Sequence, residues 1–127
     1  MSIEWLGNEV SCGVGMQSID IMASSSININ GLICKKVIPV ELKSREVYPE
    51  ILSQMQRYVN WLNQYYVSNH QSIILPVIIC RKTDKNSRNY KIFYEESQKF
   101  SINNNIPPLI YMEFFISENQ IQFERIF

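Results

Sequence analysis

The sequence predicts a single α/β (α+β) domain, a mixed β-sheet flanked by helices, over residues 1–127. No internal repeat and no linker rich in proline or glycine divides the chain. Stretches of alternating apolar and polar residues, typical of strands, surround a stretch with helical periodicity. A short run that is apolar throughout predicts a strand buried on both faces. This order of elements indicates a sheet with helices packed against it.

Composition excludes several classes of protein. The chain has 12 Lys and Arg, 12 Asp and Glu, and 46% hydrophobic residues, as in an ordinary water-soluble domain. Its longest nearly apolar run, residues 73–80, contains Pro76 and is far shorter than the ~20 residues that cross a bilayer. The N-terminal residues lack the basic and apolar regions of a secretion signal. We therefore expect a cytoplasmic protein without a membrane partner.

Cysteine and histidine usage argues against several kinds of site. Cys12, Cys34 and Cys80 are widely spaced and form no Cys-x-x-Cys pair, which predicts reduced thiols rather than disulfides or a zinc site. His70 is the only histidine and lies in a polar stretch, where an exposed loop residue is expected. A histidine-rich metal site is therefore excluded.

The predicted elements begin with a short strand at residues 9–12 and a turn at 13–15. Residues 18–43 alternate as two strands around Asn30-Gly31, the strongest short signal for a hairpin with a type I′ turn. This turn sets an antiparallel register in which Asp20 and Glu41 fall opposite each other. The register collects a mostly apolar row on the other face, which predicts that the two acids lie on the non-core side.

A helix and a buried strand are expected next. Pro49 and Glu50 suit a helix start, and apolar residues at three- and four-residue spacing predict an amphipathic helix over residues 49–66. The apolar run at 72–80 predicts one strand buried on both faces. The remaining predicted elements are a basic loop at 81–89, a helix at 90–100, and two strands at 109–116 and 121–127.

The charge is segregated along the chain. Residues 35–91 hold ten basic and four acidic side chains, so the flanking segments carry a balancing excess of acids. A basic middle can line a phosphate-binding surface, with a solvated face as the alternative. The loop residues Arg81, Lys82, Lys85 and Arg88 are candidates for phosphate contacts, or for a loop that serves only solubility.

Asp20 and Glu41 are the candidate metal ligands. Across an antiparallel pair their Cβ atoms are expected ~5 Å apart, where two carboxylates repel unless a cation lies between them. Mg²⁺, with Mn²⁺ as a substitute, suits one or two carboxylates together with water and phosphate oxygens. Lys43 shares the face of Glu41 and can neutralise a phosphate or orient an attacking water. Taken singly, each of these residues also fits a solvated strand face.

These residues resemble the PD-(D/E)xK nuclease superfamily. The resemblance spans residues 9–80 and rests on the motifs Gly15-x-x-x-Ile19-Asp20, Glu41-Leu42-Lys43 and Gln54-x-x-x-Tyr58. The last motif is typical of the RecB-like branch, and the layout is also similar to NucS-type endonucleases. The resemblance implies a restriction-endonuclease-like fold and a metal-dependent DNA endonuclease that hydrolyses phosphodiester bonds.

By that resemblance, Asp20 and Glu41 bind Mg²⁺ and Lys43 assists the attacking water. Gln54 and Tyr58 support the site or contact DNA, with a place at the edge of the core as an equal alternative. The chain departs from the family in two ways. No proline precedes Asp20, and the first helix, which frequently contributes a glutamate, is nearly absent. The nearest acids are Glu4 and Glu9, for which a structural role is favoured.

Two further expectations concern partners. DNA is the expected substrate, and a homodimer through the strands of residues 109–127, or a separate DNA-recognition domain, would complete the enzyme. The alternative function is a nuclease-like module that binds nucleic acid or protein without catalysis. Retention of Asp20, Glu41 and Lys43 together argues against that alternative.

Overall fold

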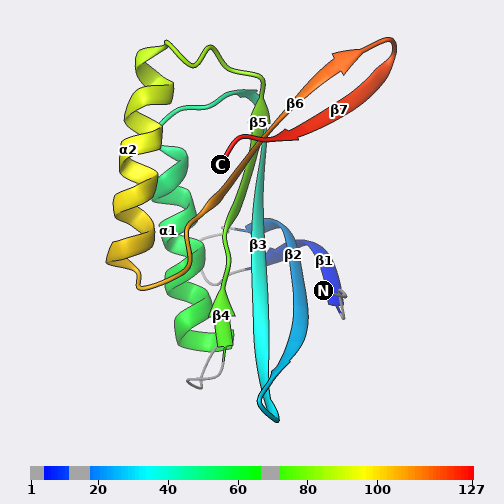
Figure 1. Cartoon of the computed structure of the whole chain (residues 1–127), viewed down its shortest axis with the longest axis vertical. Helices are drawn as coiled ribbons and strands as arrows, with labels where there is room; N and C mark the ends of the chain where they lie inside the picture. The colour runs from blue at the N-terminus through cyan, green and yellow to red at the C-terminus, as the bar shows by residue number, and fades with distance from the viewer. Residues whose placement is uncertain (1–4, 12–17, 67–71) are drawn as a thin grey trace.

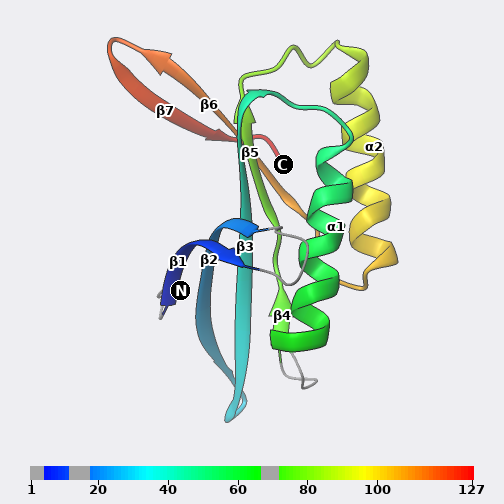
Figure 2. The same ribbon diagram turned by 180° about the vertical axis from the view of Figure 1, so that it is seen from behind.

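The computed structural model describes residues 5–11, 18–66 and 72–127. This part of the chain forms the predicted mixed α+β fold, in which two α-helices cover one face of a curled seven-stranded sheet (Figures 1 and 2). The elements are β1 (Trp5–Ser11), β2 (Ser18–Ile29), β3 (Leu32–Glu46), α1 (Ile51–Trp61), η1 (Leu62–Tyr66), β4 (Ser72–Ile74), β5 (Val77–Arg81), α2 (Arg88–Asn103), β6 (Ile110–Ser117) and β7 (Gln120–Arg125).

The sheet combines antiparallel edges with a parallel centre. Its strand order is β1-β2-β3-β5-β6-β7, and β4 pairs with β3 beside this path. The central strands β3, β5 and β6 are parallel, whereas β2 and β7 pair antiparallel with their neighbours. Parallel neighbours require crossover connections, which α1 and α2 provide. The carboxyl ends of the three central strands therefore meet at one end of the sheet.

The long β2–β3 hairpin confirms the predicted turn and register. Asn30 and Gly31 have φ values of 52° and 84°, the positive angles that a type I′ turn requires. The Asn28 side chain accepts a hydrogen bond of 3.0 Å from the Gly31 N–H, which supports the turn. The paired positions continue from the turn to Ile21 opposite Val40.

The predicted orientation of this hairpin is wrong. Glu41 lies on the face covered by the helices, where both it and Val37 are fully buried. The face expected to form the core carries Leu42, which is 46% exposed, and a small second cluster around Ala23 and Ile38. The side on which α1 and α2 cross the sheet determines the covered face, and the alternation within one hairpin does not contain that information.

Several element boundaries differ from prediction: the first strand, expected at 9–12, is Trp5–Ser11, and the second hairpin strand continues past 43 to Glu46. The strand expected at 72–80 is divided into β4 and β5, because Pro76 has no N–H to donate to a ladder. The first helix begins at Ile51 rather than 49 and ends in the π-helical segment η1. Helix α2 starts earlier than predicted because Ser87 caps it, its hydroxyl accepting a hydrogen bond from the Tyr90 N–H. The turn predicted at 13–15 lies outside the described residues, as do Cys12 and His70.

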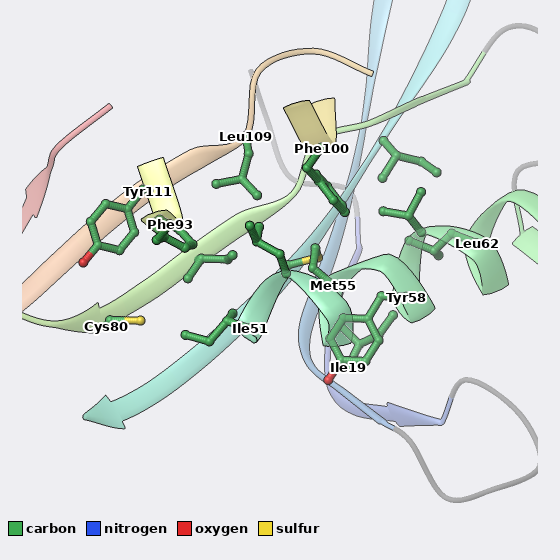
Figure 3. Close-up of a cluster of buried hydrophobic side chains, with 14 of the residues drawn as sticks. Ile19, Ile51, Met55, Tyr58, Leu62, Cys80, Phe93, Phe100, Leu109 and Tyr111 are labelled. Atoms are coloured by element: carbon green, nitrogen blue, oxygen red, sulfur yellow. The ribbon is translucent and has the colours of Figure 1, made fainter. Parts of the chain in front are cut away.

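The main core fills the space between the helices and the sheet (Figure 3). Helix α1 directs Ile51, Met55 and Tyr58 toward the strands, and η1 continues the row with Leu62, in agreement with the predicted periodicity. Cys80 of β5 is buried in the same core, and burial raises the pKa of its thiol to about 12.

In the described parts of the chain, neither α-helix has the length and apolar character needed to cross a membrane.

Candidate active site

Four of the five predicted site residues form one series of polar contacts between α1 and β3. The Gln54 side-chain amide donates to the Tyr58 hydroxyl over 2.9 Å, and that hydroxyl donates to Glu41 Oε2 over 2.8 Å. The ammonium of Lys43 lies 3.0 Å from the other oxygen, Glu41 Oε1. Gln54 reaches Tyr58 because residues four apart are neighbours on a helix surface. The predicted grouping of these four side chains is therefore present.

Asp20, the fifth predicted residue, lies beside this series of contacts. Its Oδ2 accepts a hydrogen bond of 2.9 Å from the backbone N–H of Leu42, between Glu41 and Lys43 on β3. Its negative charge contributes to raising the pKa values of both Glu41 and Lys43. The described ladder begins one position further along, at Ile21, so the Asp20 carboxylate binds the backbone of β3 rather than facing Glu41 in a regular pair.

Glu41 is a buried carboxylate whose two oxygens have different partners. Its side chain is 1% exposed, and this burial raises its pKa above the ordinary value. Hydrogen bonding from Lys43 and Tyr58 opposes the shift only in part. Oε1 accepts no hydrogen bond of good geometry from any described residue, despite its ion pair with Lys43. A buried oxygen without such a partner is uncommon, and a bound ion or water is one explanation for it.

Lys43 and Tyr58 both hold their protons firmly. Burial disfavours the ammonium of Lys43, but the adjacent Glu41 carboxylate outweighs it and raises the pKa. Burial and the same carboxylate also raise the pKa of Tyr58. At neutral pH Lys43 is therefore a cation and Tyr58 a neutral donor. Neither side chain is a general base, so the role open to Lys43 is electrostatic.

The acidic side chains available to a cation at this site are Asp20 and Glu41. Among the described residues, no three His, Cys, Asp or Glu side chains converge into a group that could hold a metal ion. Asp20 and Glu41 provide two carboxylates. Mg²⁺ is commonly held by one or two carboxylates, with water and phosphate completing its octahedron. Of the other acids considered, Glu9 belongs to β1 and Glu4 lies outside the described residues.

A second buried glutamate, which the sequence interpretation missed, lies at the same end of the sheet. Glu113 of β6 is 1% exposed, neighbours Cys80 of β5, and forms an ion pair with Lys85. Its Oε2 accepts hydrogen bonds from the Tyr111 hydroxyl over 2.6 Å and from the Thr83 N–H over 3.3 Å. Both of its oxygens thus have partners. The alternating Tyr111-x-Glu113 in an apolar strand was the available signal.

This contact changes the interpretation of the basic loop. Lys85 donates to the Thr83 carbonyl over 2.7 Å and pairs with Glu113, so it anchors the loop instead of pointing freely into solvent. Arg81, Lys82 and Arg88 are exposed. These three cations remain the candidates for phosphate contacts. They lie close in sequence to the carboxyl end of β5, at the end of the sheet where β3 carries Glu41 and Lys43.

Comparisons of the chain with models of protein families, with curated proteins and with solved structures found no match. Only the geometry of the side chains around Glu41 points to chemistry there. That geometry consists of two carboxylates, an adjacent ammonium and a buried oxygen that accepts no hydrogen bond from the described residues.

Proposed function

We propose that the chain is a Mg²⁺-dependent nuclease that hydrolyses DNA phosphodiester bonds at the Glu41 site. One observation carries the proposal: in the carboxyl-terminal half of β3, the buried Glu41 pairs with Lys43 through an oxygen that accepts no hydrogen bond of good geometry, and Asp20 of β2 binds the backbone between them. These positions match the PD-(D/E)xK pattern in residue type and order. A solvated strand face would not bury a glutamate in this way.

Each residue has a defined task in the proposal. Asp20 and Glu41 would hold the ion, with Tyr58 keeping the Glu41 carboxylate oriented and Gln54 keeping the Tyr58 hydroxyl in place. Mg²⁺ bound there would polarise the phosphate and lower the pKa of a bound water. Lys43 would leave its ion pair with Oε1 and present its positive charge to the phosphate or to the attacking water.

DNA is the proposed substrate because exposed cations lie at the end of β5 and in the loop after it, and β5 is the strand that pairs with β3 beside Glu41. Arg81, Lys82 and Arg88 are exposed, and residues 35–91 carry an excess of basic over acidic side chains. Phosphate contacts of this kind supply most of the affinity of sequence-independent DNA binding.

One observation favours a second candidate function, a module that binds nucleic acid or protein without catalysis. The carboxylates already have protein partners, because Asp20 accepts from the Leu42 N–H and Glu41 pairs with Lys43. Calorimetric titration with Mg²⁺ or Mn²⁺ separates the two functions. The nuclease binds the ion with heat that Glu41→Gln removes, whereas the module gives no such heat.

The direct test is cleavage of plasmid DNA in the presence of Mg²⁺ or Mn²⁺, with a metal chelator as the blank. We expect Glu41→Gln and Lys43→Ala to lower the rate at least about 100-fold, since even outer partners of metal ligands contribute 10- to 100-fold. The matched control is Glu113→Gln, the same change at the other buried glutamate paired with a lysine and a tyrosine. Its cleavage rate should remain within a few-fold of the original. Cleavage that persists unchanged in both site variants would reject the assignment.

A further inference from the structure

The β6–β7 hairpin projects from the body of the molecule and forms one end of the sheet (Figures 1 and 2). Every residue of β7 is exposed. Three large apolar side chains on this hairpin are more than half exposed: Ile116 at 71%, Ile121 at 61% and Phe123 at 58%. An open strand edge with apolar side chains is a template for pairing with another strand.

The apolar side chains lie together on one face of the hairpin. The register places Ile116 opposite Ile121 and Phe114 opposite Phe123. Directly opposed residues, and residues two apart on one strand, share a face of the sheet. The exposed apolar residues therefore form a continuous stripe that extends to the outer strand.

The backbone of β7 is also suited to pairing. Glu118 and Asn119 have φ values of 51° and 61°, so they form a two-residue type I′ turn closed by Ser117 and Gln120. Along an antiparallel ladder, hydrogen-bonded pairs alternate with non-hydrogen-bonded pairs. Ile121 and Phe123 belong to the non-hydrogen-bonded pairs with β6, so their backbone N–H and C=O groups point away from β6. The devices that commonly protect an edge, lysine and proline, are absent from the sequence of β7.

We propose that β7 pairs antiparallel with β7 of a second copy of this chain, about a twofold axis at Gln122. In this register Ile121 of each copy lies opposite Phe123 of the other, and the outward backbone groups of both residues meet. The two apolar stripes then join on one face of a sheet that runs through both copies. The pairing is isologous, as a closed dimer requires.

The charged residues of β7 favour one partner strand, a second copy of β7, and one register of pairing. An axis at Glu124 or at Arg125 would place like charges opposite each other, which is unfavourable. An axis at Phe123 would place Ile121 against Arg125. With the axis at Gln122, apolar residues meet apolar residues, and Gln120 meets Glu124, whose carboxylate can accept from the amide. Because β7 is complementary to itself in this register, a second copy fits it without any other partner.

The mass of the whole chain in solution tests the proposal. Analytical ultracentrifugation should give twice the 15.0 kDa of one chain, and the measured mass should fall by half in Ile121→Lys and in Phe123→Lys. The matched control is Ile102→Lys on α2, where the side chain is 79% exposed and the dimer should persist. Ile33→Lys, at the tip of the other hairpin, should also leave the dimer intact. All four positions are exposed, and circular dichroism checks that each variant is folded.

Oxidative cross-linking tests the register. In the proposed pairing the two copies of residue 122 form a non-hydrogen-bonded pair with Cα atoms about 4.5 Å apart, within disulfide range. Gln122→Cys should therefore form a covalent dimer through residue 122, identified by peptide mass, whereas Glu124→Cys should not. A monomer at all concentrations would overturn the proposal, as would a dimer that survives both lysine substitutions in β7. These measurements do not depend on nuclease activity.

Discussion

At the scale of the residue, the molecule contains two buried glutamates with similar partners and different surroundings. Glu41 contacts Lys43 and Tyr58, and Glu113 contacts Lys85 and Tyr111. The difference is one of geometry: Lys85 donates a hydrogen bond to Oε1 of Glu113, whereas Lys43 forms an ion pair of 3.0 Å with Oε1 of Glu41 without the geometry of a hydrogen bond. The proposal therefore places chemistry at Glu41 and gives Glu113 an anchoring role.

The two tyrosines allow a matched comparison. Tyr58→Phe removes the donor to Glu41, and Tyr111→Phe removes the donor to Glu113. Each change leaves a buried carboxylate without one partner, so each should lower the free energy of unfolding by about 1–3 kcal/mol. Only Tyr58→Phe should also lower the cleavage rate, by about 10- to 100-fold. Urea unfolding and plasmid cleavage measure the two effects, and equal loss of activity in both variants would contradict the assignment.

The raised pKa of Glu41 predicts a pH dependence of stability. Burial raises this pKa above its ordinary value of 4.5, so the folded protein binds the proton more tightly than the unfolded chain. The contribution of Glu41 to stability is therefore fully present below pH 4.5 and is lost as the pH rises through the folded-state pKa. Urea unfolding of the native chain and of Glu41→Gln should show the native chain losing stability relative to the variant from pH 4.5 upward. A difference that changes in the opposite direction would mean that the pKa is lowered.

Residue types and local register predicted the site, whereas burial was not predictable from them. The Asn30-Gly31 turn sets a register that brings Asp20 near Glu41, and helical spacing places Gln54 beside Tyr58. That Tyr58 reaches Glu41 depends on the face over which α1 passes, which is a property of the crossover. The Glu113 contacts depend on a loop lysine whose position no periodic pattern specifies.

At the scale of the element, local signals predicted the existence and type of each segment better than its ends. The run at 72–80 is apolar throughout and predicts a single strand, but the missing N–H of Pro76 divides it. Helix α2 begins at Arg88 because the Ser87 hydroxyl satisfies the N–H of Tyr90. Caps and prolines thus determine these ends, which periodicity alone does not locate.

The Ser87 cap has a measurable effect on stability. Ser87→Ala removes the acceptor for the Tyr90 N–H and should lower the free energy of unfolding by about 1 kcal/mol. Ser53→Ala in α1 is the control, because Ser53 is exposed within a helix and alanine is a better helix former. Thermal or urea unfolding of the two variants provides the comparison. Equal stability of the native chain and Ser87→Ala would show that the cap contributes nothing.

At the scale of the whole molecule, the parallel centre of the sheet brings distant segments to one end. The carboxyl ends of β3 and β5 carry the Glu41 site and lead into the basic loop, although the two lie about 40 positions apart in the sequence. The Glu41-Leu42-Lys43 motif and the basic loop were both predicted from the sequence. Their common position follows from the β3–α1–β5 crossover.

This arrangement predicts a salt-dependent affinity for DNA. In the presence of a metal chelator, the logarithm of the binding constant should fall linearly with that of the salt concentration, by about 0.9 per neutralised phosphate. Arg81→Ala and Lys82→Ala should each reduce the slope by about one phosphate contact. Lys99→Ala, on the exposed surface of α2, should leave the slope unchanged. Equal slopes in all three variants would show that the basic loop does not belong to the proposed DNA-binding surface.

The buried ion pair of Glu41 and Lys43 serves the proposed activity but makes the protein less resistant to heat. Replacing a buried ion pair by apolar side chains of similar volume often makes a protein sturdier, by about 1–4 kcal/mol. Laboratory evolution that rewarded survival of heating alone would therefore favour aliphatic residues at positions 41 and 43. The resulting lineage would be harder to melt and would lose the proposed nuclease activity, so keeping both properties would require selection for each.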